Sequence, residues 1–282
     1  TYGGNTDNEY TQKFGKQQGK YYVPQRAAAG LDPWATPQAY DNAKDFFDTG
    51  ITWSNSLNVA QMLDKSSYSI SLGNTHQDGI ISSTGMDRYN VKVSADTKLT
   101  NNWSSGFTAN YITTSIDKAV TSGNGLLRTV YAAPPSYDLA GIPSHVDGNP
   151  YTQNSFRGSF DNAYWAMENN KFTEDTNRFF GNVYASYQTD FGTTNHKLNA
   201  KYMVGVDAYT THYVDSYGYG SNTGGGRGQI ENYGWTNATY NSLLTINYDW
   251  HINEDWGLNA VVGNEIIQSN RKKYYEYGTN YN

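Results

Sequence analysis

The sequence has 282 residues, a formal net charge of −6 at pH 7, 37% hydrophobic residues, 26 Tyr and no Cys. Its hydrophobic share lies below the roughly 45–50% of ordinary globular domains, which disfavours a conventional soluble core. The acidic balance argues against a nucleic-acid partner, and the lack of Cys excludes disulfides and Cys-based metal sites. No run of about 18 apolar residues is present, so a membrane-spanning helix is excluded as well.

The first 50 residues show no sustained period, and we expect them to form an extracellular loop segment. Apolar and polar residues then alternate in eight segments, which is the pattern of strands with one apolar and one polar face. The clearest case is 68–72, where Tyr68, Ile70 and Leu72 alternate with Ser69 and Ser71. The predicted strands cover about 51–62, 67–77, 86–98, 103–114, 177–190, 197–213, 236–250 and 256–268.

The connections between these segments are alternately short and long. Tight turns follow the first, third, fifth and seventh strands, whereas long loops are predicted at about 115–176 and 214–235. Outer-membrane barrels show this asymmetry, with short periplasmic turns and long extracellular loops. Aromatic residues beside the short turns are typical of an interfacial girdle: Trp103, Phe191, Trp250 and Trp256.

The predicted fold is all-β, an antiparallel transmembrane β-barrel wall of about eight sequential strands. These strands form an open, curved sheet within residues 51–268, as part of a larger barrel. The alternative is a β-sandwich of a secreted protein, whose core face would alternate in the same way. Strands of about 11–14 residues favour the barrel, because strands in globular proteins are most often about 5–6 residues long.

Both ends of the predicted sheet lie on the long-loop side. We therefore expect residues 269–282 to begin a further extracellular segment and the chain to be a middle piece of a larger protein. The alternation also predicts which side chains face lipid and which face the lumen. The lipid-facing set comprises Val91, Val93, Val183, Ala185, Tyr202, Val204, Leu244 and Ile246. The lumen-facing set comprises Asn90, Lys92, Asn182, Ser186, Lys201 and Asn241.

Several short motifs resemble the SusC/RagA type of TonB-dependent nutrient transporter. The resemblance covers most of residues 1–200 and weakens beyond them. One departure is Ala60-Gln61-Met62, which stands where the family usually has Ser-Gly-Gly. The motifs are Tyr2-Gly3-Gly4-Asn5; Phe46-Phe47-Asp48-Thr49-Gly50 with Asn55-Ser56-Leu57; Gln77-Asp78-Gly79-Ile80-Ile81 with Arg88-Tyr89-Asn90; and Trp165 to Asn170 with Asn177-Arg178-Phe179-Phe180-Gly181-Asn182.

The resemblance implies import across the outer membrane of a Gram-negative, Bacteroidetes-like bacterium. Members of this family form barrels of about 22 strands, closed by an N-terminal plug domain. They act with a SusD-type surface lipoprotein and with TonB, and take up a glycan or a peptide. The plug and the TonB-contacting segment are not part of this sequence, so contact with the TonB complex would run through that N-terminal part. Two alternatives remain, a passive porin without a plug and a soluble β-rich glycan-binding protein.

Candidate contact residues come from the loops, where aromatic faces can stack on sugar rings or contact a partner. We single out Trp34, Tyr131, Tyr137, Tyr151, Tyr164 and Trp165 as substrate-binding or partner-contact candidates. The alternative is that these side chains only pack the loops, which need a small core of their own.

No catalytic, metal or cofactor motif is visible. The five His residues have no metal-ligand spacing, and the Gly-rich stretch at 224–228 lacks the Lys-Ser/Thr of a phosphate loop. Acidic residues in the 115–176 loop could hold calcium, but a solvated acidic loop is the simpler explanation. The sequence thus predicts part of a transporter that needs no cofactor, and not an enzyme.

Overall fold

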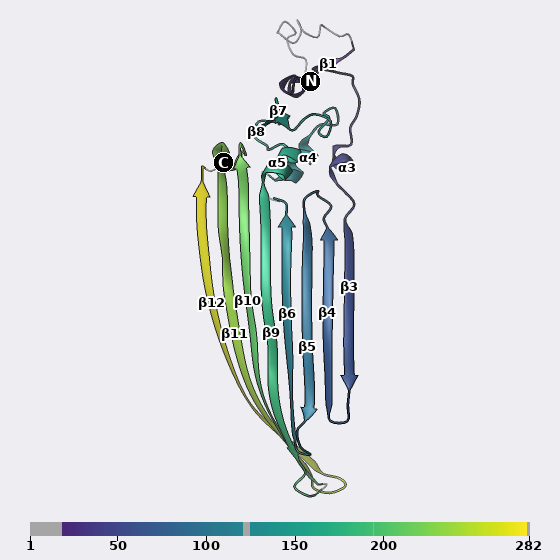
Figure 1. The fold of residues 1–282 in the computed structure, drawn as a ribbon, viewed down its shortest axis with the longest axis vertical. Helices are drawn as coiled ribbons and strands as arrows, with labels where there is room; N and C mark the ends of the chain where they lie inside the picture. Colours follow the sequence, from purple (N-terminus) through teal and green to yellow (C-terminus); the bar gives the residue numbers. More distant parts are fainter. Residues whose placement is uncertain (1–18, 121–124, 194, 281–282) are drawn as a thin grey trace.

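The structure is a computed structural model that describes residues 19–120, 125–193 and 195–280. Eight long strands dominate it and run side by side in Figure 1. They are β3 (Ile51–Met62), β4 (Ser66–Asp78), β5 (Gly85–Lys98), β6 (Trp103–Lys118), β9 (Lys171–Thr189), β10 (His196–Tyr219), β11 (Arg227–His251) and β12 (Gly257–Thr279).

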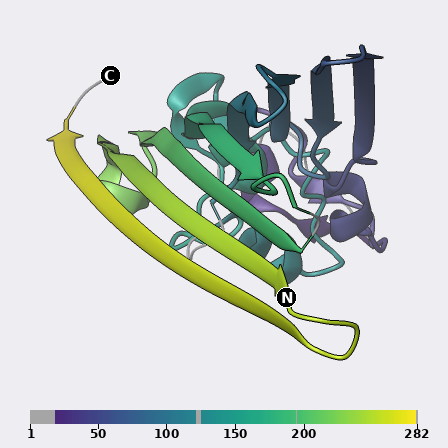
Figure 2. The same ribbon diagram turned by 90° about the horizontal axis from the view of Figure 1, so that it is seen from below.

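These strands form one antiparallel sheet in the order β12-β11-β10-β9-β6-β5-β4-β3, which is their order in the sequence. Strands β3 and β12 lie at opposite edges of a curved, open sheet (Figure 2). The predicted fold class is confirmed. In the described part of the chain the other two sheets have only two strands each, so no second large sheet exists to build the alternative sandwich.

The strand register separates two faces, because residues paired across strands point to the same side. One row runs through Ile70, Val93 and Ala109, and another through Phe107, Val183 and Val204. We call this side the apolar face, and its side chains are open; Val183, for example, is 52% exposed. The opposite side, which carries Asn182 paired with Gly205, is the polar face. The two residue sets that the sequence assigned to lipid and lumen lie on these opposite faces.

The apolar face has the height that a lipid bilayer requires. On β10 it runs from Leu198 to Ala208, which at ~3.3 Å per residue and a tilt of ~40° gives a band of roughly 25 Å. The edge of the band beside the short turns carries aromatic rings. The ring centroids of Trp103 and Tyr187 lie 5.0 Å apart there. The edge of the band on the long-loop side is a row of cross-strand pairs of polar residues, such as Asn177 with Thr210. On β12 the band is interrupted by two amide side chains, Asn264 and Gln268.

The strands extend beyond the predicted boundaries on the long-loop side. Strand β9 begins at Lys171, β10 continues to Tyr219, β11 begins at Arg227 and β12 continues to Thr279. The connection predicted at 214–235 is therefore reduced to 220–226, and β12 continues through most of the segment 269–282. Beyond the apolar band the alternation of apolar and polar residues fades, although the strands remain paired.

Short elements cover the long-loop end of the sheet, and we call residues 19–50 and 125–170 the loop lobe. Figure 1 shows α4 and α5 beyond the upper ends of β6 and β9, and α3 above β3. Its elements are β1 (Tyr21–Tyr22), α2 (Pro24–Ala28), β2 (Trp34–Ala35), α3 (Asn42–Phe46), α4 (Leu126–Ala132), β7 (His145–Val146), β8 (Asn149–Gln153) and α5 (Ala163–Asn169). Helix α5 begins where the Asn162 side chain accepts hydrogen bonds from the backbone N–H groups of Tyr164 and Trp165.

The helices of the lobe are short, and within the described residues no helix is long and apolar enough to cross a membrane. The motif at residues 2–5 lies outside the described residues.

A charge on the apolar face tests the assignment of the two faces. We expect Val204→Arg to destabilise the bilayer-inserted protein by about 2–4 kcal/mol, because Val204 lies near the middle of the apolar band. Lys201→Arg, on the polar face of the same strand, is the matched control and is expected to stay within about 0.5 kcal/mol of the parent. Denaturant titration of the intact barrel in lipid vesicles measures both, and an equal loss in the two variants would contradict the assignment.

Candidate functional site

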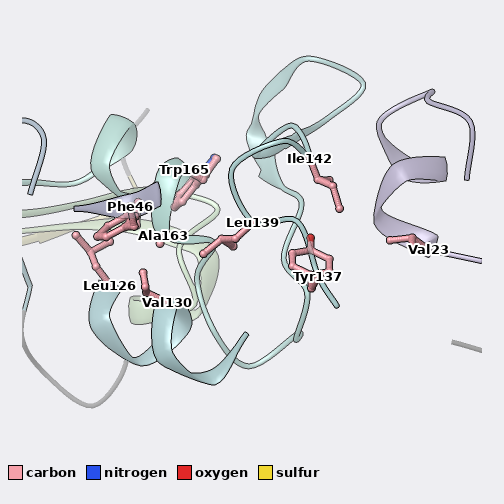
Figure 3. Close-up of a cluster of buried hydrophobic side chains, with 10 residues drawn as sticks. Val23, Phe46, Leu126, Val130, Tyr137, Leu139, Ile142, Ala163 and Trp165 are labelled. Carbon is pink, nitrogen blue, oxygen red and sulfur yellow. The ribbon is translucent and has the colours of Figure 1, made fainter. Parts of the chain in front are cut away.

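The loop lobe has its own hydrophobic core, drawn in Figure 3. Segments that are far apart in the sequence supply it, so the lobe is a packed unit and not a set of independent loops. Backbone and amide hydrogen bonds join the same segments: Asn42 Nδ2 donates to the Tyr137 carbonyl at 2.9 Å, and its Oδ1 accepts from the Leu139 N–H at 3.0 Å. The core comprises Val23, Phe46, Leu126, Val130, Tyr137, Leu139, Ile142, Ala163, Trp165 and Ala166.

The structure divides the six candidate aromatic residues between this core and the surface. Trp165 and Tyr137 are 0% and 1% exposed and belong to the core, and Trp34 is buried elsewhere in the lobe, with its ring edge-to-face on Tyr22 at 5.6 Å. Trp165 also donates from Nε1 to the Pro150 carbonyl at 2.7 Å. Tyr131 and Tyr151 are 69% and 50% exposed, so they are free to contact a ligand or partner. For the buried three, packing is the role that the described contacts support.

Tyr164 lies between these two groups. Its ring packs edge-to-face on Phe46 at 5.4 Å, and its hydroxyl donates to the Asp45 carbonyl at 3.3 Å. Partial burial raises the pKa of the Tyr164 hydroxyl, and the negative charges of Asp45, Asp138 and Asp48 raise it further. The phenol therefore stays protonated and acts as a hydrogen-bond donor.

A buried carboxylate fastens the lobe to the tip of the β10–β11 hairpin. Asp161 is 4% exposed, and its oxygens accept from Ser221 Oγ at 2.6 Å, Asn222 N at 2.7 Å, Asn222 Nδ2 at 2.8 Å and Gln153 Nε2 at 2.8 Å. Gln153 Nε2 also donates to the Gly220 carbonyl at 2.8 Å. Four neutral donors thus compensate the desolvation of one buried charge.

A second group of aromatic side chains lies on the polar face of β10–β12, and we call it the aromatic ladder: Tyr213, Tyr233, Trp235 and Tyr275. Tyr213, Tyr233 and Tyr275 are cross-strand partners in one row. The rings of Tyr213 and Tyr233 stack at 5.0 Å with 9° between their planes, and Tyr275 lies 6.4 Å from Tyr233. Trp235 lies 5.4 Å from Tyr213. The row stands ~16 Å along β10 from the end of the apolar band, on the loop side.

Charged side chains surround the ladder. Lys118 Nζ lies 4.5 Å from the Tyr213 ring centre and pairs with Glu174 at 3.3 Å. The Arg271 guanidinium lies 4.8 Å from the Trp235 ring. Tyr233 Oη donates to Asp215 Oδ2 at 3.1 Å. Hydroxyl donors, carboxylates and cations thus lie on one surface, and such groups can bind a polar ligand.

Sequence reasoning missed the ladder because its members are far apart along the chain. Tyr213 lies at the end of one predicted strand, Tyr233 falls in a predicted loop and Tyr275 in a predicted extracellular segment. A period-two signal was present, since Tyr233 and Trp235, like Tyr275 and Tyr277, are separated by one residue. Only the strand register shows that these pairs are neighbours.

Metal-ligating groups do not gather in the structure as described. Across residues 19–120, 125–193 and 195–280, no three His, Cys, Asp or Glu side chains come close enough together to hold a metal ion.

The open sheet with its two faces defines the class of the fold, the wall of a large antiparallel β-barrel. No protein-family model matches the sequence, and no curated protein matches it. Solved structures do match. The RagAB peptide importer in its closed-closed and open-open states aligns with 86% of this chain at 16% identity and a TM-score of 0.70. The RagAB peptide transporter aligns at 14% identity and a TM-score of 0.71. The chain spans 27% of the length of each solved chain, and at this identity the similarity establishes a shared fold.

Truncating the central core residue tests whether the lobe is one unit. We expect Trp165→Ala to destabilise the lobe by about 3–5 kcal/mol, because it leaves a cavity where a buried indole was. Faster hydrogen exchange of the amides of α4 and α5 in the intact protein reports the loss. Tyr131→Ala, at an exposed ring in the same lobe, is the control and should leave exchange unchanged. Unchanged exchange in the Trp165 variant would contradict a packed lobe.

Removing one carboxylate oxygen tests the attachment of the lobe to the hairpin. We expect Asp161→Asn to weaken this contact by about 1–3 kcal/mol. The new amide NH2 group would face the hydrogen-bond donors from which the Asp161 carboxylate now accepts. Exchange of the Asn222 amide should rise selectively. Asp147→Asn, at an exposed position in the same lobe, is the matched control, and an equal response in both variants would show that Asp161 has no special role.

Proposed function

We propose that this chain is part of a SusC/RagA-type, TonB-dependent transporter in the outer membrane of a Gram-negative, Bacteroidetes-like bacterium. The whole protein would import a glycan or a peptide together with a SusD-type lipoprotein. The observation that carries the proposal is the sheet itself: eight strands in sequence order, with one apolar face of bilayer height and one polar face. The hairpin motifs of the sequence and the fold of the RagAB importer support the same conclusion.

The two faces fit the two environments of a barrel wall. The apolar face would meet lipid hydrocarbon, where unpaired polar groups are costly. The polar face would line the lumen and carries cross-strand pairs such as Arg178–Asp207, with Nε–Oδ1 at 2.8 Å. The loop lobe would stand at the extracellular mouth, where its exposed Tyr131 and Tyr151 could contact substrate or the lipoprotein.

The alternative functions differ from this proposal in what they require. A soluble glycan-binding protein would have to cover its apolar face, yet Val183, Val204 and Leu72 are open to the surface. A passive porin would share the wall but would need neither a plug nor an energy source. Dependence of uptake on TonB therefore separates the transporter from the porin.

The test is uptake by cells that express the intact gene. We expect the protein to fractionate with the outer membrane, and uptake of its labelled peptide or glycan nutrient to fall about tenfold or more when TonB is inactivated. Passive entry of a small sugar through an unrelated porin of the same cells is the control and should not change. Uptake that persists without TonB would establish the porin instead, and a soluble product would overturn both barrel functions.

A further inference from the structure

On the polar face, the unpaired charges next to the aromatic ladder differ in sign between its two sides. Asp215 and Glu231 lie on its outward side, towards the loop lobe, and they are direct cross-strand partners. Arg271 and Lys273 lie on its inward side, two residues apart on β12 and therefore on the same face. The aromatic rings occupy the space between the two pairs.

The acidic pair is an unfavourable arrangement for the chain by itself. Like charges directly opposite each other on neighbouring strands destabilise a sheet. Among the described residues, Asp215 accepts from the neutral Tyr233 hydroxyl, and Glu231 accepts from Gln229 Nε2 at 2.9 Å and from the neutral Tyr275 hydroxyl. Within the described residues, neither carboxylate forms an ion pair with a Lys, Arg or His side chain. The pair thus lacks a cation.

The basic pair, Arg271 and Lys273, lacks an anionic partner. Arg271 rests on the Trp235 ring, and neither Arg271 nor Lys273 has a carboxylate partner in the described part of the chain. Trp235 Nε1 is buried and, within the described residues, has no hydrogen-bond partner. A ligand that brings an anion to this end and a cation to the other would satisfy both pairs.

The ring geometry argues against a sugar at this position. A sugar ring stacks on an open aromatic face. In the ladder, Tyr213 and Tyr233 stack on each other, Lys118 lies over Tyr213 and Arg271 lies over Trp235. Tyr213, Tyr233 and Trp235 are thus engaged with one another and with cations, and of the four ladder rings Tyr275, which is 62% exposed, keeps an open face. A single open ring is a small stacking surface for a sugar chain.

We propose that the aromatic ladder with its two charged pairs binds a short oligopeptide by both free termini. The terminal ammonium would lie at Asp215 and Glu231, and the terminal carboxylate at Lys273 and Arg271. Along β11, the distance from Glu231 to the partner of Lys273 is ~13 Å and to the partner of Arg271 ~20 Å. An extended peptide of about four to six residues spans that distance. This inference rests on the proposed function, since it places the site on the lumen side of the transporter.

Binding of a pentapeptide to the purified intact transporter tests the inference. The probe is Ala-Gly-Ser-Gly-Ala with free termini. The comparison ligands are the same peptide with an acetylated N-terminus and amidated C-terminus, and a linear glucose pentasaccharide. We expect calorimetry to show that capping weakens binding about tenfold or more, because two charge-assisted contacts are lost. The pentasaccharide is expected not to compete.

Charge-removing variants locate the site. Asp215→Asn with Glu231→Gln should weaken the free peptide about tenfold and leave the capped peptide unchanged, and Lys273→Gln should act in the same way. Lys272→Gln changes the neighbouring residue, on the apolar-face side of β12, and is the matched control that should change nothing. Unchanged barrel abundance in the outer membrane shows that the variants fold.

The outcomes separate this inference from the proposed function. Equal binding of free and capped peptide, or equal effects of the Lys273 and Lys272 variants, would overturn the terminal-binding site while TonB-dependent uptake stands. Displacement of the peptide by the pentasaccharide would overturn the peptide assignment in favour of a glycan. Loss of TonB dependence would instead remove the transporter function on which the inference rests.

Discussion

Backbone hydrogen bonding between neighbouring strands is the constraint on which this structure depends. A strand in hydrocarbon has no water to satisfy its N–H and C=O groups, so each strand must pair with a neighbour over its full length in the bilayer. The register here is unbroken along the long hairpins, for example from His196 paired with Trp250 to Asp215 paired with Glu231. Continuous pairing fixes the period of two, and the period of two creates the separate apolar and polar faces.

A wall of this kind has no interior, which explains both the composition and the place of the hydrophobic core. Within the described residues, the hydrophobic core cluster lies in the loop lobe and not between the strands. Only every second strand residue in the band has to be apolar, and Tyr serves at several of those positions, such as Tyr202 and Tyr240. A modest share of hydrophobic residues is therefore enough for a wall, whereas the lobe needs Trp165, Phe46 and Leu139 to close its own small core.

The sequence was sufficient for the wall because alternation is a local signal. It located all eight strands, their order and the side of the sheet on which residues such as Val93 and Lys92 lie. It failed beyond the apolar band, where β10 and β11 lengthen and apolar residues no longer keep to one face. It also failed for contacts set by register: Tyr213, Tyr233 and Tyr275 meet only through pairing across three strands. For Trp165, an aromatic residue in a loop sequence is compatible with packing and with binding, and burial favours packing.

The lobe and the ladder are mechanically connected through the outward ends of β10 and β11. Asp161 holds Ser221 and Asn222 at the hairpin tip, and Tyr151 packs edge-to-face on Tyr219 at 5.8 Å. Phe172 packs on Tyr217 at 5.1 Å. Both strands carry ladder residues and the acidic pair only a few residues further along. Strands β10 and β11 are each paired with a neighbour on both sides here, so backbone hydrogen bonds hold the hairpin in place. The β10–β11 hairpin therefore carries both the contact with the loop lobe, at its tip, and the ladder residues Tyr213 and Tyr233, a few residues further along its strands.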